Sequence, residues 1–177
     1  IDSAPGEGTT VTIHLENQCP DETTEENENM WKDRSRYTSL AGKRILLVED
    51  HPLNAQIAQK ILEKMQVIVT YAENGRVAVE KYQASEEYCF DAILMDIRMP
   101  VMDGIEAARK IRALNKEDAK TIPILAMTAN AFQDDMDATA AAGMNEHLSK
   151  PIEPQKLYQA LTHHVKVSST HSTIYNQ

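Results

Sequence analysis

The sequence predicts an α/β fold built on a parallel sheet with helices on both faces. Between residues 43 and 165, short apolar runs alternate with longer amphipathic segments, which is the pattern of successive strand–helix units. The runs are apolar at consecutive positions, as in Ile45–Val48 and Ile93–Met95, rather than at every second position. Strands of this kind are buried on both faces, so the sheet is expected to lie between two layers of helices.

Apolar spacing and β-branched residues predict the first two strand–helix units. A strand is expected over residues 44–49, and Pro52 suits the first turn of the helix that follows. Large apolar residues recur every four positions along that helix and predict its buried face: Leu53, Ile57, Ile61 and Met65. β-branched side chains predict a second strand over residues 67–71, and a helix follows over residues 75–84, where Tyr82 is expected to be buried.

The other three units repeat the pattern. Strands are expected over residues 92–95, 122–127 and 146–148, and Pro123 is tolerated because it lies near the start of its strand. The helices that follow are expected to begin near Asp103, Phe132 and Pro154. Gly143 is expected to end the fourth helix in a left-handed conformation. Five such units favour a flavodoxin-like (βα)5 fold with a five-stranded parallel sheet of order 2-1-3-4-5.

Polar residues follow the strands at one edge of this sheet. Glu49 and Asp50 follow the first strand, Asp96 the third, Thr128 the fourth and Lys150 the fifth. Strands one and three are neighbours in the expected order, so the three carboxylates should converge in one crevice. Such a crevice needs a cation, and oxygen ligands without His or Cys suit Mg²⁺. A carboxylate beside Mg²⁺ can attack phosphorus, helped by a positive charge from Lys150 and a hydroxyl from Thr128.

Composition excludes several classes of function. The formal net charge of −9 argues against binding to nucleic acid or to anionic membranes. No apolar run reaches membrane-spanning length, and no signal peptide opens the chain. Cys19 and Cys89 lack metal-ligand spacing and are interpreted as unpaired thiols in a reducing compartment, so a cytoplasmic location is expected.

The chain divides into four parts by composition. Residues 1–15 end in an alternating strand pattern over Val11–Leu15, and residues 16–42 form an acidic linker with few aliphatic side chains. Residues 43–165 hold the strand–helix units, and residues 166–177 form a polar tail.

Four segments of residues 43–165 together resemble the receiver (response regulator) domain of two-component signal transduction, and specifically the receivers fused to hybrid sensor histidine kinases. They are Leu46–Asn54 (LLVEDHPLN), Met95–Gly104 (MDIRMPVMDG), Ala126–Ala129 (AMTA) and Ala142–Pro151 (AGMNEHLSKP). The joint pattern covers roughly two thirds of the chain and is highly specific. The resemblance implies a phosphoprotein that uses Mg²⁺.

The resemblance also implies a role for individual residues. Asp96 would accept the phosphoryl group, Asp50 would ligate Mg²⁺ directly, Glu49 would act through a water, and Arg98 would offer its backbone carbonyl to the metal. Lys150 would pair with the phosphoryl group. A cis peptide is implied before Pro151. Met99, Pro100 and Gly104 would shape the loop after Asp96.

Two further residues would form the switch that reports phosphorylation. Thr128 would supply its hydroxyl, and His147 falls where the family commonly has Tyr or Phe. The His adds a titratable group at that position. Glu49 likewise replaces the commoner Asp, as occurs in hybrid-type receivers.

The first residues resemble a different family segment. Gly6–Leu15 (GEGTTVTIHL) is similar to the closing hairpin of a histidine kinase ATP-binding domain, with Val11 at the aromatic position. The rest of that ATP site is not in this sequence, so the chain is not expected to phosphorylate itself from ATP. It would catalyse only the phosphorylation and dephosphorylation of its own Asp96.

The expected function is therefore a phosphorelay step. Asp96 would take a phosphoryl group from the phosphohistidine of a histidine kinase dimerisation domain and pass it to a histidine phosphotransfer protein or domain. An alternative is a receiver-like docking module that is never phosphorylated. A flavodoxin-type cofactor carrier would need a phosphate loop rich in Ser, Thr or Gly after the first strand, and Glu49–Pro52 has the wrong charge for that.

Overall fold

The computed structural model describes residues 2–4, 8–10, 39–129 and 133–165. The chain separates into two units, residues 1–33 and 34–177. In the first unit, β1 (Asp2–Ala4) pairs antiparallel with β2 (Gly8–Thr10). The strand expected over Val11–Leu15 lies outside the described residues, as do most of the linker and the polar tail.

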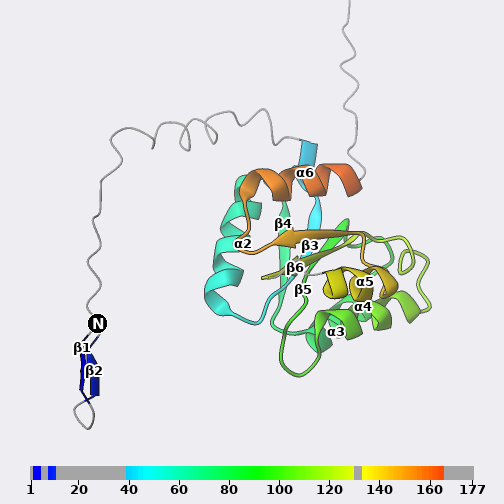
Figure 1. The fold of residues 1–177 in the computed structure, drawn as a ribbon. Helices are drawn as coiled ribbons and strands as arrows, with labels where there is room; N and C mark the ends of the chain where they lie inside the picture. Colours follow the sequence, from blue (N-terminus) through cyan, green and yellow to red (C-terminus); the bar gives the residue numbers. More distant parts are fainter. Residues whose placement is uncertain (1, 5–7, 11–38, 130–132, 166–177) are drawn as a thin grey trace, which may run out of the picture. The chain divides into compact units, whose positions relative to one another are not determined.

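The second unit is built on a five-stranded parallel sheet (Figure 1). Its strands are β3 (Arg44–Val48), β4 (Ile68–Ala72), β5 (Ala92–Asp96), β6 (Ile124–Thr128) and β7 (Glu146–Ser149). Their order across the sheet is β4-β3-β5-β6-β7, which is the expected 2-1-3-4-5 order. The register places Val48 beside Met95 and Asp96 beside Met127, so the carboxyl ends of the strands meet at one edge.

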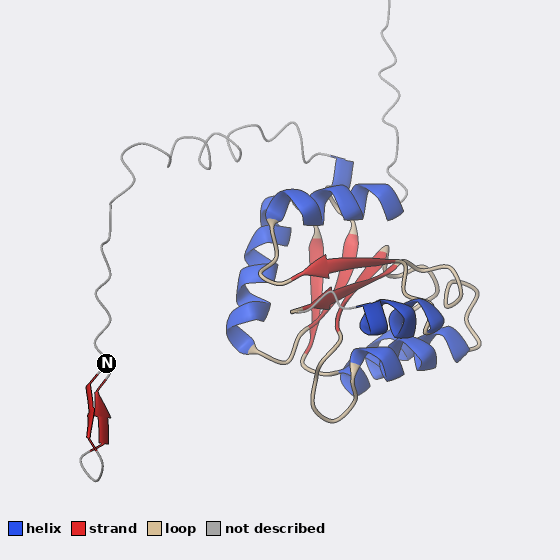
Figure 2. Cartoon of the chain, viewed as in Figure 1, coloured by secondary structure: helices blue, strands red, loops and turns tan. Residues whose placement is uncertain are grey.

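Five helices alternate with these strands (Figure 2). They are α2 (Pro52–Lys64), α3 (Gly75–Ala84), α4 (Gly104–Ala113), α5 (Gln133–Ala141) and α6 (Pro154–His164). Helices α2 and α6 lie on one side of the sheet and α3, α4 and α5 on the other (Figure 1). Asn74 and Asp103 cap α3 and α4, because their side chains accept backbone N–H bonds from Val77 at 3.0 Å and Glu106 at 2.7 Å. The predicted α/β fold is therefore confirmed.

The core explains why the strand runs are continuous. Residues 45–48 of β3, 92–96 of β5 and 124–128 of β6 are buried throughout, since helices cover both faces of the sheet. Gly143 ends the α5 segment with a φ of +83°, as predicted from its position. The loops at the carboxyl edge are thereby attached to a rigid sheet.

The buried face predicted for α2 is half wrong. Leu53 and Ile57 are 58% and 48% exposed, whereas the residues buried in the helix are Ala55, Ala58, Ile61 and Leu62. The small alanine side chains let the first half of the helix lie close to the sheet, so the larger apolar side chains point to solvent. The prediction followed the spacing of the large apolar residues, so it was right for Ile61 and Met65 and wrong for Leu53 and Ile57.

None of the helices that the structure describes has the length and apolar composition needed to cross a bilayer.

Candidate active site

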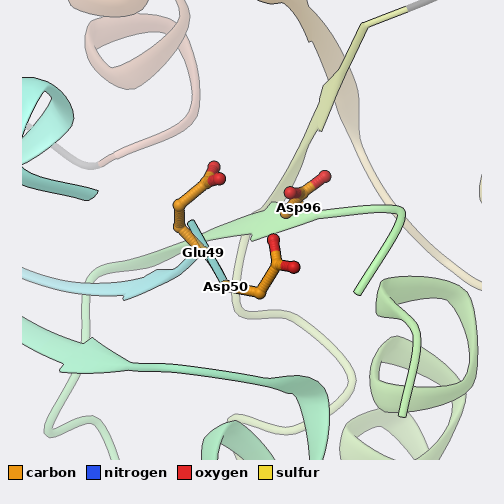
Figure 3. Close-up of side chains that lie close together, drawn as sticks. All are labelled: Glu49, Asp50 and Asp96. Atoms are coloured by element: carbon orange, nitrogen blue, oxygen red, sulfur yellow. The ribbon is translucent and has the colours of Figure 1, made fainter. Parts of the chain in front are cut away.

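The three predicted carboxylates lie together at the carboxyl edge of the sheet. Glu49 and Asp50 directly follow β3, and Asp96 is the last residue of the neighbouring β5. One carboxylate oxygen from each lies within 4.8 Å of the others. Figure 3 shows the three side chains gathered at the ends of the two strands. We call Glu49, Asp50 and Asp96 the acidic cluster.

Glu49 is the most constrained member of the acidic cluster. Its side chain is buried, and its two carboxylate oxygens have different protein partners: Lys150 Nζ lies 2.5 Å from Oε2, and the Asn54 amide donates to Oε1 at 3.0 Å. The main chain is held as well, because the Tyr71 hydroxyl donates to the Glu49 carbonyl at 2.8 Å and the Glu49 N–H donates to Ala72. Glu49 is therefore fixed by groups from α2, β4 and the loop after β7.

Asp96 lies between a cation and a backbone donor. Lys150 Nζ donates to Oδ2 at 2.6 Å, and the Arg98 N–H donates to Oδ1 at 3.2 Å. Burial raises the pKa of the Asp96 carboxyl. The Lys150 contact lowers it in part, and the nearby charge of Glu49 raises it further. The ionised form of Asp96 therefore costs free energy in this cluster unless a cation offsets it.

Lys150 bridges the two buried acids. Burial by itself lowers the pKa of the lysine, but the hydrogen bonds and charges of Asp96 and Glu49 outweigh it, so the net pKa is raised. The ammonium therefore stays charged at neutral pH. Its backbone N–H donates to the Thr128 carbonyl at 2.8 Å, which ties the end of β7 to the end of β6, and the Lys150–Pro151 peptide bond is cis.

The loop between β5 and α4 packs tightly under Asp96. The Gly104 N–H donates to the Ile97 carbonyl at 2.9 Å, and a Cβ at Gly104 would lie only 2.1 Å from the backbone oxygen of Asp96. Met99 is buried, whereas Pro100 and Val101 are exposed. Only glycine allows this close return of the chain to the strand end.

The two predicted switch residues lie on the neighbouring strands β6 and β7. Thr128, at the end of β6, is buried, and His147 in β7 is half-buried. The His147 ring contacts the Thr139 hydroxyl of α5 through Nε2. Both residues line a groove of about 880 Å³ bounded by β7 and α6. His147 therefore has a polar partner on α5, which an aromatic hydrocarbon ring would lack.

The donor set fits a hard divalent cation. Three carboxylates and one ammonium leave a formal excess of two negative charges in the cluster. All ligand atoms on offer are oxygens, and Mg²⁺ prefers oxygen ligands. Glu49, Asp50 and Asp96 are the residues of the cluster that could hold it.

Asp96→Asn is expected to stabilise the domain at pH 7 in the absence of divalent cations, because the neutral amide removes a buried negative charge beside Glu49 and leaves Lys150 paired with Glu49. The pKa of Asp96 is raised on folding, so folding favours the protonated carboxyl. The stability that this carboxyl adds to wild type is complete below the ordinary pKa of 3.8 and is lost as the pH rises through the folded-state pKa. The advantage of the variant should therefore shrink as the pH falls. Urea unfolding in EDTA from pH 4 to 7 checks this, and a variant less stable than wild type at pH 7 would contradict it.

Two residues that hold Glu49 were missed in the sequence. Asn54 looks like an ordinary polar residue in the first turn of a helix, and Tyr71 looks like a strand residue of high β-propensity. Two signals could have pointed to Asn54: it closes the receiver-like segment Leu46–Asn54, and it lies five residues after Glu49 although Asn is a weak helix former.

Known proteins resemble this chain in sequence and fold. A family model described as "Response regulator receiver domain" matches residues 45–162. "Probable histidine kinase 5" from Oryza sativa subsp. japonica is 35% identical over 149 residues, which cover 74% of this chain and 12% of that protein. The chain thus spans about an eighth of the length of that relative.

Solved structures agree with the sequence comparison. The receiver domain of sensor histidine kinase PA1611 from Pseudomonas aeruginosa, with a magnesium ion coordinated in its active site cleft, is 41% identical with a TM-score of 0.63, over 70% of this chain and 98% of that one. The receiver domain of Ssk1 from Saccharomyces cerevisiae, solved with the histidine phosphotransfer protein Ypd1, is 30% identical with a TM-score of 0.64, over 71% of this chain and 90% of that chain. The chain therefore belongs to the response regulator receiver domain family and is homologous to the receivers of hybrid histidine kinases.

Proposed function

We propose that this receiver domain takes a phosphoryl group from a phosphohistidine onto Asp96, with Mg²⁺, and relays it to the histidine of a phosphotransfer protein. The observation that carries the proposal is the position of the Asp96 carboxylate, 2.6 Å from the Lys150 ammonium and within the acidic cluster. A nucleophile, a fixed cation and oxygen ligands for a metal are thus within reach of one phosphoryl group.

The reaction needs little more than positioning and charge. An Asp96 carboxylate oxygen forms the new O–P bond as the P–N bond of the phosphohistidine breaks, and the imidazole nitrogen keeps the electron pair. Lys150 offers its ammonium to the phosphoryl oxygens, and Thr128 offers its hydroxyl. Mg²⁺, when bound, supplies further neutralisation of negative charge at the phosphoryl group. In this proposal Asp50 would ligate the metal directly, Glu49 would act through a water, and Arg98 would offer its backbone carbonyl.

The surface of α2 supports a docking role beside the site. Leu53 and Ile57 expose apolar side chains there. Ile57 also lines a small cleft with Glu49, Asn54, Lys150, Pro151 and Ile152. We propose that a phosphotransfer protein docks on this surface, since the related Ssk1 receiver was solved in complex with such a protein. The groove near Thr128 and His147 is proposed as the face that responds to phosphorylation.

The parent protein is proposed to be a hybrid sensor kinase. The relatives of this chain include proteins named histidine kinases in which the matched segment is a small part of the length. Residues 1–15 are proposed as the end of the kinase ATP-binding domain, which agrees with the antiparallel pairing of β1 and β2.

Mass spectrometry of the intact protein tests the phosphoryl transfer. With Mg²⁺ and either acetyl phosphate or phosphoramidate, which offers a P–N bond, wild type is expected to gain the mass of one phosphoryl group. Asp96→Asn removes the nucleophile and should gain none. Asp137→Asn, an exposed aspartate in α5, is the matched control and should gain one.

The same experiment separates the alternative function. A docking module that is never phosphorylated would show no gain with either donor, in the presence or absence of Mg²⁺. If Asp96→Asn gained as much phosphoryl mass as wild type, the modified residue would be a different one, and the proposal would be rejected.

A further inference from the structure

We propose that Asn54 is a positioning residue of the acidic cluster: its side-chain amide holds the Glu49 carboxylate in the orientation in which the cluster binds a divalent cation. The contact is direct, with 3.0 Å between Asn54 Nδ2 and Glu49 Oε1. The inference deepens the proposed function, because it concerns the metal requirement of the same site.

Side-chain freedom is the reason that Glu49 needs such a partner. Its backbone is held on both sides by Ala72 and Tyr71, so the remaining freedom lies in the side chain. A glutamate has one more rotatable bond than an aspartate, and ordering it costs conformational entropy. Lys150 binds only Oε2, so a rotation about this contact is prevented by the second contact at Oε1.

The chemistry of an amide suits this position. The Asn54 amide donates a hydrogen bond without adding a positive charge, so the cluster keeps its formal excess of two negative charges for a dication. An Arg or Lys at the same place would compete with the metal. Asn54 thus orients one acid and leaves the charge balance unchanged.

The helix itself does not require Asn54. The residue is exposed in the first turn of α2, where alanine has the higher helix propensity. Its side-chain N–H donates to the Glu49 carboxylate, outside the helix, and the N-cap His51 makes no side-chain cap bond. Asn54→Ala should therefore fold, and its defect should appear in metal binding.

The test measures Mg²⁺ affinity from the shift of the thermal unfolding midpoint with Mg²⁺ concentration. Asn54→Ala is expected to weaken Mg²⁺ binding about tenfold, and Gln56→Ala, an exposed residue of the same helix, should leave it unchanged. Phosphoryl uptake from acetyl phosphate should need correspondingly more Mg²⁺ in Asn54→Ala, with the rate at saturating Mg²⁺ nearly restored.

A double-mutant cycle with Glu49→Asp separates positioning from a general loss of structure. The shorter side chain of the Glu49→Asp variant cannot reach the amide, so adding Asn54→Ala to it should cause little further loss of Mg²⁺ affinity. Additive losses, or equal Mg²⁺ affinity in wild type and Asn54→Ala, would overturn the inference, as would a wild type that binds no Mg²⁺. If wild type binds Mg²⁺ and Asn54→Ala binds it less well, but no variant gains phosphoryl, the proposed function fails while the positioning role stands.

Discussion

Gly104→Ala is expected to destabilise the receiver by about 3 kcal/mol or more, which is at the large end for a single substitution. The added Cβ would lie 2.1 Å from the backbone oxygen of Asp96 and 2.9 Å from Cγ of Met95. The first of these atoms belongs to the main chain of a buried strand, so it cannot move aside without disturbing the sheet. The end of β5 or the start of α4 must shift instead.

Urea unfolding with Mg²⁺ and with EDTA measures the effect. Gly42→Ala is the control for backbone strain without a clash, because its φ of +76° disfavours alanine but no atom lies within 4 Å of the added Cβ. That variant should lose only about 1–2 kcal/mol. A larger loss for Gly42→Ala than for Gly104→Ala would contradict the steric explanation. Because the clash is at Asp96 itself, Gly104→Ala should also slow phosphoryl uptake in the fraction that remains folded.

Lys150→Met is expected to cost about 3–5 kcal/mol of folding free energy in EDTA. The ammonium lies 2.5 Å from Glu49 Oε2 and 2.6 Å from Asp96 Oδ2, and both acids are buried. Without the ammonium, the carboxylates of Glu49 and Asp96 are left in a buried site with no positive charge between them. Chemical denaturation in EDTA gives the size of the loss.

Mg²⁺ should restore much of the stability of Lys150→Met. The variant cluster keeps its three carboxylates and has lost the competing cation, so Mg²⁺ should stabilise it more than it stabilises wild type. Lys156→Met, which removes an exposed lysine paired with Glu153, controls for the loss of a surface charge and should change stability by less than about 1 kcal/mol. Equal stabilisation of Lys150→Met and wild type by Mg²⁺ would contradict this account.

The element order could be predicted because each strand and helix has a local signature. Continuous apolar runs marked the buried strands, and Gly143 marked the end of α5. Boundaries moved by one or two residues, as at β4, which begins at Ile68 instead of Val67. The orientation of α2 could not be predicted, because it depends on how closely Ala55 and Ala58 let the helix approach the sheet.

The sequence alone determined which residues meet at the candidate site. Asp96, Glu49, Asp50 and Lys150 lie at or just after the carboxyl ends of strands, and parallel strands bring such residues to one edge of a sheet. Only the tertiary structure decided how those groups are held: Lys150 joins two buried acids, and Asn54 and Tyr71 fix Glu49 from separate elements. Some of these contacts join side chains far apart in the chain, as between Glu49 and Lys150. Local sequence carries no periodic signal for such contacts, because they are set by the packing of the elements between them.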